Sequence, residues 1–164
     1  MNQTVDALCH ELNPKDESAV TKLLAQYGPA FDHGKADAYA LLFTQDGQLS
    51  FPDGKGGTTV IKGRVALAKF TEQAYKSSYE TGASGVHFAG KTILVQISHD
   101  TIHAYTPVTM ILLQENAQPA ASIMSVGQYV DVIKKVEGEW LFASRTADSY
   151  ITGPLPAEFL PPNE

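Results

Sequence analysis

The chain has 164 residues, a size that fits one domain with a substantial buried core. Hydrophobic residues make up 43% and charged residues 18%, and no apolar run approaches the roughly 20 residues of a membrane-spanning helix, which argues against disorder and membrane insertion. The net charge of -6 and the scattered Lys and Arg argue against a nucleic acid partner. The single cysteine, Cys9, and a polar start without the layout of a secretory signal predict a cytoplasmic protein.

Both ends of the chain are predicted to be tails. Residues 1–15 are polar and end in Asn13-Pro14, which disfavours helix at Asn13. Residues 153–164 hold four prolines, which cannot continue a sheet interior. We therefore expect an N-terminal tail over 1–15, one domain over 16–151 and a Pro-rich C-terminal tail over 152–164.

Helical periodicity follows the first tail. We expect Asp16 as an N-cap. The apolar residues of one buried stripe come next, namely Val20, Leu23, Leu24, Tyr27 and Phe31. Pro29 cannot donate to the carbonyl of Ala25, so the helix is expected to bend or stop there, with Gly34 as terminator. Residues 36–43 predict a second short helix, and Gly63 precedes a third helix of roughly three turns.

The period then changes to that of strands. Residues 47–51 and 58–62 predict a hairpin around the turn 53–57, and 77–85 is small and polar, as expected of a loop. Four long strands are predicted over 86–97, 101–114, 122–136 and 139–151. This order predicts an α+β fold, in which a curved, mostly antiparallel sheet of about six strands wraps against three N-terminal helices. Such a cone has an internal pocket, the usual place for a small molecule.

Two further sequence patterns do not indicate a metal site or a phosphate-binding loop. His99 and His103 have i, i+4 spacing, but on a strand this separates them by about 13 Å, so no metal site is predicted. The glycines at 54, 56 and 57 lack the Lys-Ser/Thr sequel of a phosphate loop and predict a hairpin turn. We therefore expect no cofactor.

Several short segments carry a family resemblance. The stretch from Tyr27 to Asp32, the pair Gly63-Arg64, and the segment from Val86 through His87 to Gly90 resemble the SnoaL-like family of the nuclear-transport-factor-type (cystatin-like cone) superfamily. The resemblance covers about residues 16–150. This superfamily holds dehydratases, isomerases, epoxide hydrolases, polyketide cyclases and non-catalytic subunits, so the fold does not fix the reaction.

The resemblance also implies site residues. In scytalone dehydratase and bile acid 7α-dehydratase, a histidine in the place of His87 is paired with an aspartate in the place of Asp32. The second histidine of scytalone dehydratase has no counterpart here, because Leu112 stands in its place. The pattern is therefore closer to that of the bile acid enzyme, where an arginine resembling Arg145 lies near the substrate carrier.

These residues imply acid–base chemistry. His87 is the expected base, Asp32 orients it and stabilises the imidazolium, and the Tyr27 hydroxyl donates to a carbonyl or departing hydroxyl. The structural alternatives are a solvated helix end for Asp32, a core histidine for His87 and a core tyrosine for Tyr27.

Four more residues are expected to bind the substrate. Arg145 alternates with Leu141, Ala143 and Ala147 on the last strand, and an inward arginine needs an anion or carboxylate partner. Asp131 and Tyr129 on the neighbouring strand, together with Phe51, complete this set. The alternative for Arg145 is a strand-end arginine that faces water or a subunit interface.

The sequence thus predicts a cofactor-independent dehydratase or isomerase that acts on a hydrophobic oxygenated small molecule of polyketide, steroid or terpenoid type. Dehydration, isomerisation and ring closure all begin with proton removal and stay open. The alternative is a non-catalytic ligand-binding or structural subunit whose cavity is filled by its own side chains, and contact of Asp32 with His87 inside an open pocket discriminates between the two. By analogy we expect a homodimer.

Overall fold

The computed structural model describes residues 12–114, 120–149 and 157–159. Three helices come from the first half of the chain: α1 (Pro14–Asp32), α2 (Ala36–Leu41) and α3 (Arg64–Thr81). The strands are β1 (Phe43–Pro52), β2 (Thr58–Lys62), β3 (Ala83–Ala89), β4 (Ile93–Ser98), β5 (Thr101–Gln114), β6 (Ala121–Val136) and β7 (Glu139–Ser149). A short 3₁₀ turn, η1 (Ala157–Phe159), follows.

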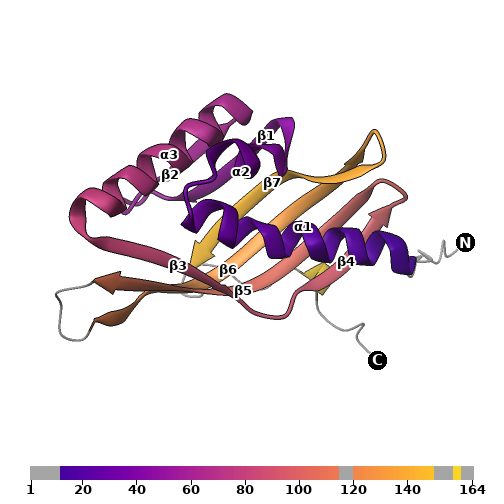
Figure 1. Cartoon of the computed structure of the whole chain (residues 1–164). Helices are drawn as coiled ribbons and strands as arrows, with labels where there is room; N and C mark the ends of the chain where they lie inside the picture. The colour runs from indigo at the N-terminus through magenta and orange to yellow at the C-terminus, as the bar shows by residue number, and fades with distance from the viewer. Residues whose placement is uncertain (1–11, 115–119, 150–156, 160–164) are drawn as a thin grey trace, which may run out of the picture.

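The strands form one open seven-stranded sheet in the order β2-β1-β7-β6-β5-β3, and β4 also pairs with β5. Only β1 and β7 run parallel; the other pairs of the sheet are antiparallel. Figure 1 shows α1 lying across the curved sheet, with α2 and α3 beside it over β1 and β2. The predicted α+β fold, with a curved and mostly antiparallel sheet against three helices, is confirmed.

Several predicted boundaries are wrong. Residues 77–85 are not a loop, because α3 continues to Thr81 and β3 begins at Ala83. The predicted strand 86–97 is two strands, and both pair with β5. The second helix ends at Leu41, so that β1 already begins at Phe43. The predicted C-terminal tail lies outside the described residues except for η1, and the division into two tails and one domain stays a prediction.

The first helix begins and ends for local chemical reasons. Asn13, and not Asp16, is its N-cap: the Asn13 side chain accepts a hydrogen bond from the Asp16 backbone N–H, and Pro14 takes the first helical position. The helix does not stop at Pro29 but continues to Asp32. Gly34 then terminates it with φ of 63°, a left-handed conformation that glycine adopts without strain.

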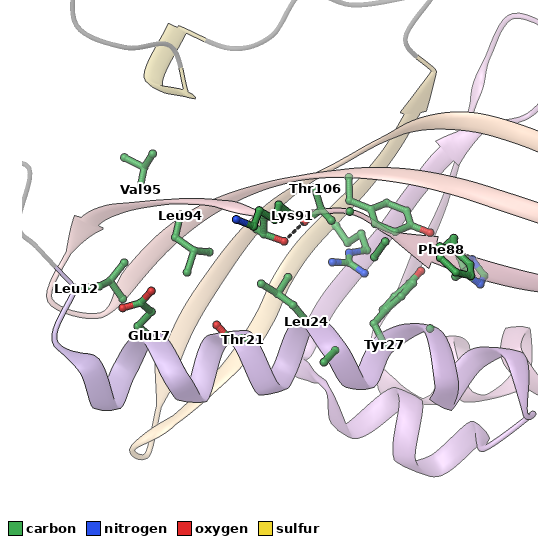
Figure 2. Close-up of a pocket in the computed structure, with 18 of the residues that line it drawn as sticks. Leu12, Glu17, Thr21, Leu24, Tyr27, Phe88, Lys91, Leu94, Val95 and Thr106 are labelled. Atoms are coloured by element: carbon green, nitrogen blue, oxygen red, sulfur yellow. Dashed lines mark hydrogen bonds between the residues drawn. The ribbon is translucent and has the colours of Figure 1, made fainter.

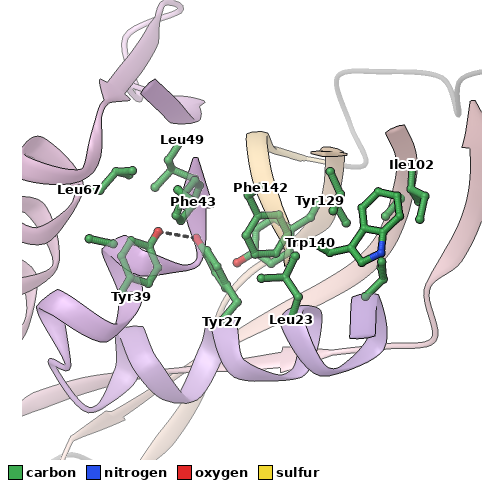
Figure 3. Packing of buried hydrophobic residues seen from close by; sticks show 14 of the residues in the cluster. Leu23, Tyr27, Tyr39, Phe43, Leu49, Leu67, Ile102, Tyr129, Trp140 and Phe142 are labelled. Atoms are coloured by element: carbon green, nitrogen blue, oxygen red, sulfur yellow. Dashed lines mark hydrogen bonds between the residues drawn. The ribbon is translucent and has the colours of Figure 1, made fainter. Parts of the chain in front are cut away.

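The core lies between α1, α2 and the concave face of the sheet (Figure 3). The predicted stripe on α1 is buried at Val20, Leu23 and Tyr27 and partly buried at Leu24 and Phe31. Its partners on the sheet include Phe43 and Phe142, neither of which is exposed. Burial of this one stripe therefore places α1 against the sheet, which sets the position of its last turn.

The first turn of α1 is held by a polar cluster around Asp16. Its carboxylate accepts hydrogen bonds from Lys135 Nζ and Trp140 Nε1, both at 2.8 Å, and from Asn13 Nδ2 at 2.7 Å. These three bonds, led by that from Lys135, lower the pKa of Asp16 from 3.8 to about 2, against the opposing effect of burial. The cluster ties the start of α1 to the β6–β7 hairpin.

Among the described residues, no helix combines the length and apolar character that crossing a membrane would require.

Asp16→Asn is expected to lower the urea midpoint of unfolding at neutral pH. Because the folded-state pKa lies below the unfolded one, Asp16 stabilises the fold above about pH 4, and this contribution disappears as the pH falls towards 2. The difference between wild type and variant should therefore vanish in acid. The fluorescence of Trp140, the single tryptophan, reports unfolding next to the substitution. Glu72→Gln, an exposed change on α3, is the control, and equal midpoints for wild type and Asp16→Asn at pH 7 would contradict the assignment.

Candidate functional site

The last residue of α1 meets the middle of β3. The Asp32 Oδ1 atom lies 2.5 Å from His87 Nδ1, and Asp32 Oδ2 accepts the His87 backbone N–H at 2.9 Å. Both side chains are largely buried, with 11% and 7% of their surface exposed. An acceptor at Nδ1 places the ring proton there and leaves the Nε2 lone pair available. The two residues that sequence analysis paired are therefore in direct contact.

Gly28 makes this contact sterically possible. It lies one turn before Asp32 on the same face of α1, and a Cβ atom built there would lie 3.3 Å from His87 Cβ and 3.9 Å from Asp32 Oδ2. The first of these distances is tighter than an ordinary van der Waals contact. A residue without a side chain thus lets the helix backbone approach β3 closely.

His87 borders a large cavity between α1 and the sheet (Figure 2). The cavity has a volume of about 1150 Å³. Apolar and polar groups line it together; they include Leu24, Tyr27 and Gly28 from α1, Leu94 and Thr92 from β4 and the loop before it, and Thr106, Tyr129 and Arg145 from the sheet. No described residue hydrogen-bonds His87 Nε2, so this nitrogen is free to meet a ligand.

Tyr27 projects from α1 into the same cavity and lies edge-on to His87, with ring centroids 5.9 Å apart. Its oxygen accepts a hydrogen bond from the Tyr39 hydroxyl at 3.1 Å. Burial raises the pKa of Tyr27, so the phenol keeps its proton at neutral pH. With its oxygen already engaged as an acceptor, Tyr27 can still donate its own O–H to a ligand.

Arg145 and Asp131 form a buried ion pair. The arginine Nε and Nη2 atoms donate to the two carboxylate oxygens at 2.8 and 2.7 Å, and Asp131 is its direct cross-strand partner. Burial alone would lower the pKa of Arg145, but the charge and hydrogen bonds of Asp131 outweigh it and raise that pKa. The inward arginine predicted from sequence therefore has its carboxylate partner within the protein.

Three aromatic rings cover the guanidinium of Arg145. Its Cζ atom lies 3.9 Å from the ring centroid of Tyr27, 4.2 Å from that of Tyr129 and 4.3 Å from that of Phe142. These are cation–π contacts in a desolvated setting. The Nη1 atom makes no hydrogen bond to a described residue, and Arg145 borders the cavity.

The other substrate-binding candidates divide into two groups. Tyr129 borders the cavity on the sheet side, whereas Phe51 stacks on Phe70 of α3 and is not among the described residues that line the cavity. Asp131 meets a ligand only through Arg145, since its two oxygens both bind the guanidinium.

The predicted alternation of Arg145 with Leu141 and Ala143 is wrong. A bulge in β7 brings Arg145 to the inner face of the sheet, which it shares with Phe142.

Two other histidines, His99 and His103, make their contacts away from this site, and the exposed His33 follows Asp32 in the sequence. The His103 ring bonds Glu158 at 2.9 Å, and the side chain of His99 is 92% exposed. Within the described segments, no group of three or more His, Cys, Asp and Glu side chains is placed to hold a metal ion.

Sequence reasoning missed two residues of the site. Tyr39 was not among the predicted site residues, yet its hydroxyl is the hydrogen-bond partner of Tyr27. Gly28 was passed over, although a glycine inside an otherwise regular helical pattern signals a close backbone approach.

The SnoaL-like domain model matches residues 14–146, and the chain belongs to this family. Among solved structures, it is similar to ActVI-ORFA of Streptomyces coelicolor, with 18% identity, a TM-score of 0.72, and coverage of 87% of this chain and 100% of that one. An NTF2-like protein with a cystatin-like fold from Novosphingobium aromaticivorans is 21% identical, with a TM-score of 0.71 and coverage of 85% of this chain and 84% of that one. A candidate scytalone dehydratase from that organism is 23% identical, with a TM-score of 0.63 and coverage of 81% of this chain and 83% of that one.

A search of curated proteins finds no match to this sequence. The structural similarities establish the NTF2-like cone fold, and the resemblance stated from sequence is confirmed at the level of family. At these identities they leave the reaction to be argued from the site.

Gly28→Ala is expected to preserve the fold while loosening the Asp32–His87 contact. Alanine favours a helix interior over glycine by about 1 kcal/mol, which offsets part of the steric cost. The new methyl group must push His87 away by a few tenths of an ångström. The measurement is the downfield proton NMR signal of the His87 Nδ1–H, which should move upfield or broaden.

Gly85→Ala is the matched control on β3, because a Cβ there would meet Met110 at an ordinary 3.7 Å. A downfield signal that is the same in Gly28→Ala as in wild type would show that Gly28 does not set this contact.

Proposed function

We propose that this protein is a cytoplasmic, cofactor-independent dehydratase or isomerase of hydrophobic oxygenated small molecules, of polyketide, steroid or terpenoid type. The observation that supports it best is the 2.5 Å contact between Asp32 and His87 at the edge of a cavity. Side chains alone supply acid–base chemistry of this kind.

In the proposed reaction, His87 Nε2 removes a proton from the carbon next to a substrate carbonyl. The proton resides on Nε2, and Asp32 stabilises the imidazolium through its hydrogen bond to Nδ1. Negative charge then develops on the carbonyl oxygen, and the Tyr27 hydroxyl, whose ring lies 5.9 Å from that of His87, is the proposed donor to it. In a dehydration the enolate expels the β-hydroxyl, which takes the proton from His87 Nε2 and leaves as water. In an isomerisation the same proton returns from Nε2 to another carbon.

Arg145 and Tyr129 are proposed to line the substrate pocket, with Arg145 donating from Nη1. The Asp131 carboxylate balances the charge of Arg145, so this donation suits a neutral oxygen better than it attracts an anion. Asp131 acts through Arg145 in this proposal, while Phe51 supports the helix α3 rather than the ligand.

The alternative of a non-catalytic subunit with a cavity filled by its own side chains fits less well. The described residues leave about 1150 Å³ open beside His87, and this volume admits a drug-sized ligand.

His87→Ala is expected to reduce turnover by about 10²- to 10⁴-fold, because it removes the general base. Wild type and variant are compared on β-hydroxy ketones with polyketide, steroid and terpenoid skeletons, and the conjugated enone product is followed by its ultraviolet absorbance. His99→Ala, an exposed histidine, is the control. Turnover in His87→Ala equal to wild type would remove the base assignment, and failure of the wild type on every skeleton would favour the non-catalytic alternative.

We also propose a homodimer formed by the helix-free face of the sheet. Side-chain alternation places an apolar group on the face opposite His87, and its most exposed members on β5 and β6 are Leu113, Ile123 and Val126. An exposed apolar patch of this kind marks an interaction site, and two-fold symmetric copies are the commonest occupants. Ile123, 69% exposed, is expected at its centre.

Ile123→Asp is accordingly expected to convert a sedimenting dimer into a monomer, since it places a charge in an apolar interface. Analytical ultracentrifugation of wild type and variant measures this. A monomeric wild type, or an unaffected dimer in the variant, would contradict the placement.

A further inference from the structure

The cavity has a second polar point, formed by two threonines. Thr92 Oγ1 and Thr106 Oγ1 lie 2.8 Å apart, and either one can be the donor. Both residues line the cavity, and Thr106 is only 2% exposed. Figure 2 shows Thr106 on the sheet side of the cavity, with Leu24 and Tyr27 on the α1 side. The pair therefore presents two hydroxyl groups to the cavity, one on the buried Thr106 and one on the half-buried Thr92.

Counting hydrogens shows what this pair lacks. Two hydroxyl groups carry two hydrogens, and one of them lies between the oxygens of Thr92 and Thr106. No other hydrogen bond joins either hydroxyl to a described residue. One O–H donor, on either threonine, is thus left for an acceptor in the cavity.

The position of this donor relative to His87 follows from the strand register. His87 on β3 pairs with Met110 on β5, and Thr106 lies four residues earlier on β5, on the same inward face. This offset corresponds to about 13 Å along the strand. The two polar points therefore lie at separate ends of the cavity.

The wall between the two ends is mainly apolar. Tyr129 is the β6 partner of Thr106, and its ring centroid lies 6.4 Å from that of His87, so this ring spans the gap on the sheet side. Leu24 lies one turn before Gly28 on α1 and borders the cavity opposite. An occupant must present apolar surface here and oxygen atoms beyond it at both ends.

We propose that the Thr92–Thr106 pair is a second recognition point, which donates a hydrogen bond to a carbonyl or hydroxyl oxygen at the end of the ligand remote from His87. The preferred ligand is then an elongated fused-ring compound with an oxygen at each end. This inference rests on the proposed function, since it assigns the other end of the ligand to His87 and Tyr27.

The test measures binding, which does not require turnover. Isothermal titration calorimetry compares progesterone, which carries a ketone at each end, with its analogue that lacks the side-chain ketone. A second pair is an anthracenediol with hydroxyls at opposite ends and the corresponding anthracenol. Wild type is expected to bind the two-oxygen member of at least one pair about tenfold more tightly, the value of one hydrogen bond.

The double variant Thr92→Val/Thr106→Val, which removes both hydroxyls at nearly constant shape, should abolish that tenfold preference and leave the affinity for the one-oxygen member unchanged. Both threonines are changed because either hydroxyl can be the donor. Thr92→Ser/Thr106→Ser keeps both hydroxyls and should retain the preference. Thr58→Val, an exposed threonine on β2, is the control. Equal weakening of both members by the double valine variant, a preference that survives it, or no binding of any probe to wild type would overturn the proposal.

The result of this binding test can be distinguished from the result of the turnover test of the proposed function. Should His87→Ala leave turnover intact while Thr92→Val/Thr106→Val removes the preference, the base assignment fails and the second recognition point stands. Should His87→Ala abolish turnover while the double valine variant keeps the preference, the reverse holds.

Discussion

The buried ion pair between Arg145 and Asp131 is the constraint on which the site depends. Removing two charges from water costs several kcal/mol for each ion, and this cost is compensated only by good geometry and strong hydrogen bonds between the partners. Here the bonds are bidentate at 2.7 and 2.8 Å, and the rings of Tyr27, Tyr129 and Phe142 cover the guanidinium. The pair thereby contacts three rings, of which those of Tyr27 and Tyr129 line the cavity and that of Phe142 lies in the core. One of them, Tyr27, belongs to α1, so the same contact holds this helix over the sheet.

Held in this position, α1 supplies three residues of the site. Leu24, Gly28 and Asp32 follow one another at i, i+4 spacing on the flank of α1, and they provide in turn a cavity wall, the close approach to β3 and the carboxylate for His87. Because Asp131 balances Arg145, the donors available to a ligand include Nη1 of Arg145, the Tyr27 hydroxyl and one threonine hydroxyl, and Lys91 also lines the cavity. A cavity with these donors and apolar walls suits a neutral oxygenated compound.

Most of the fold could be predicted because its elements carry strong periodic signals. The stripe of α1 and the alternation of β5 and β6 are buried on one side, and such patterns survive in sequence. The errors fall where burial is weak. The end of α3 is exposed, with Tyr79 83% accessible, so 77–85 reads as loop. The sequence does not indicate the break between β3 and β4. Both strands pair with β5, and Gly90 between them still donates its N–H to Pro107 of β5.

The site was less predictable, since two of its features depend on tertiary geometry. Asp32 lies off the stripe of α1 and appears solvated until β3 covers that flank of the helix. The ion pair depends on one inserted residue. Counting across the hairpin from Val136 and Glu139 would pair Asp131 with Ser144 and would turn Arg145 to the opposite face. The register instead shifts by one between Val132 and Ile133, so that Asp131 faces Arg145. A β-bulge that redirects one side chain, which no propensity marks in the sequence, thus brings the cation inside.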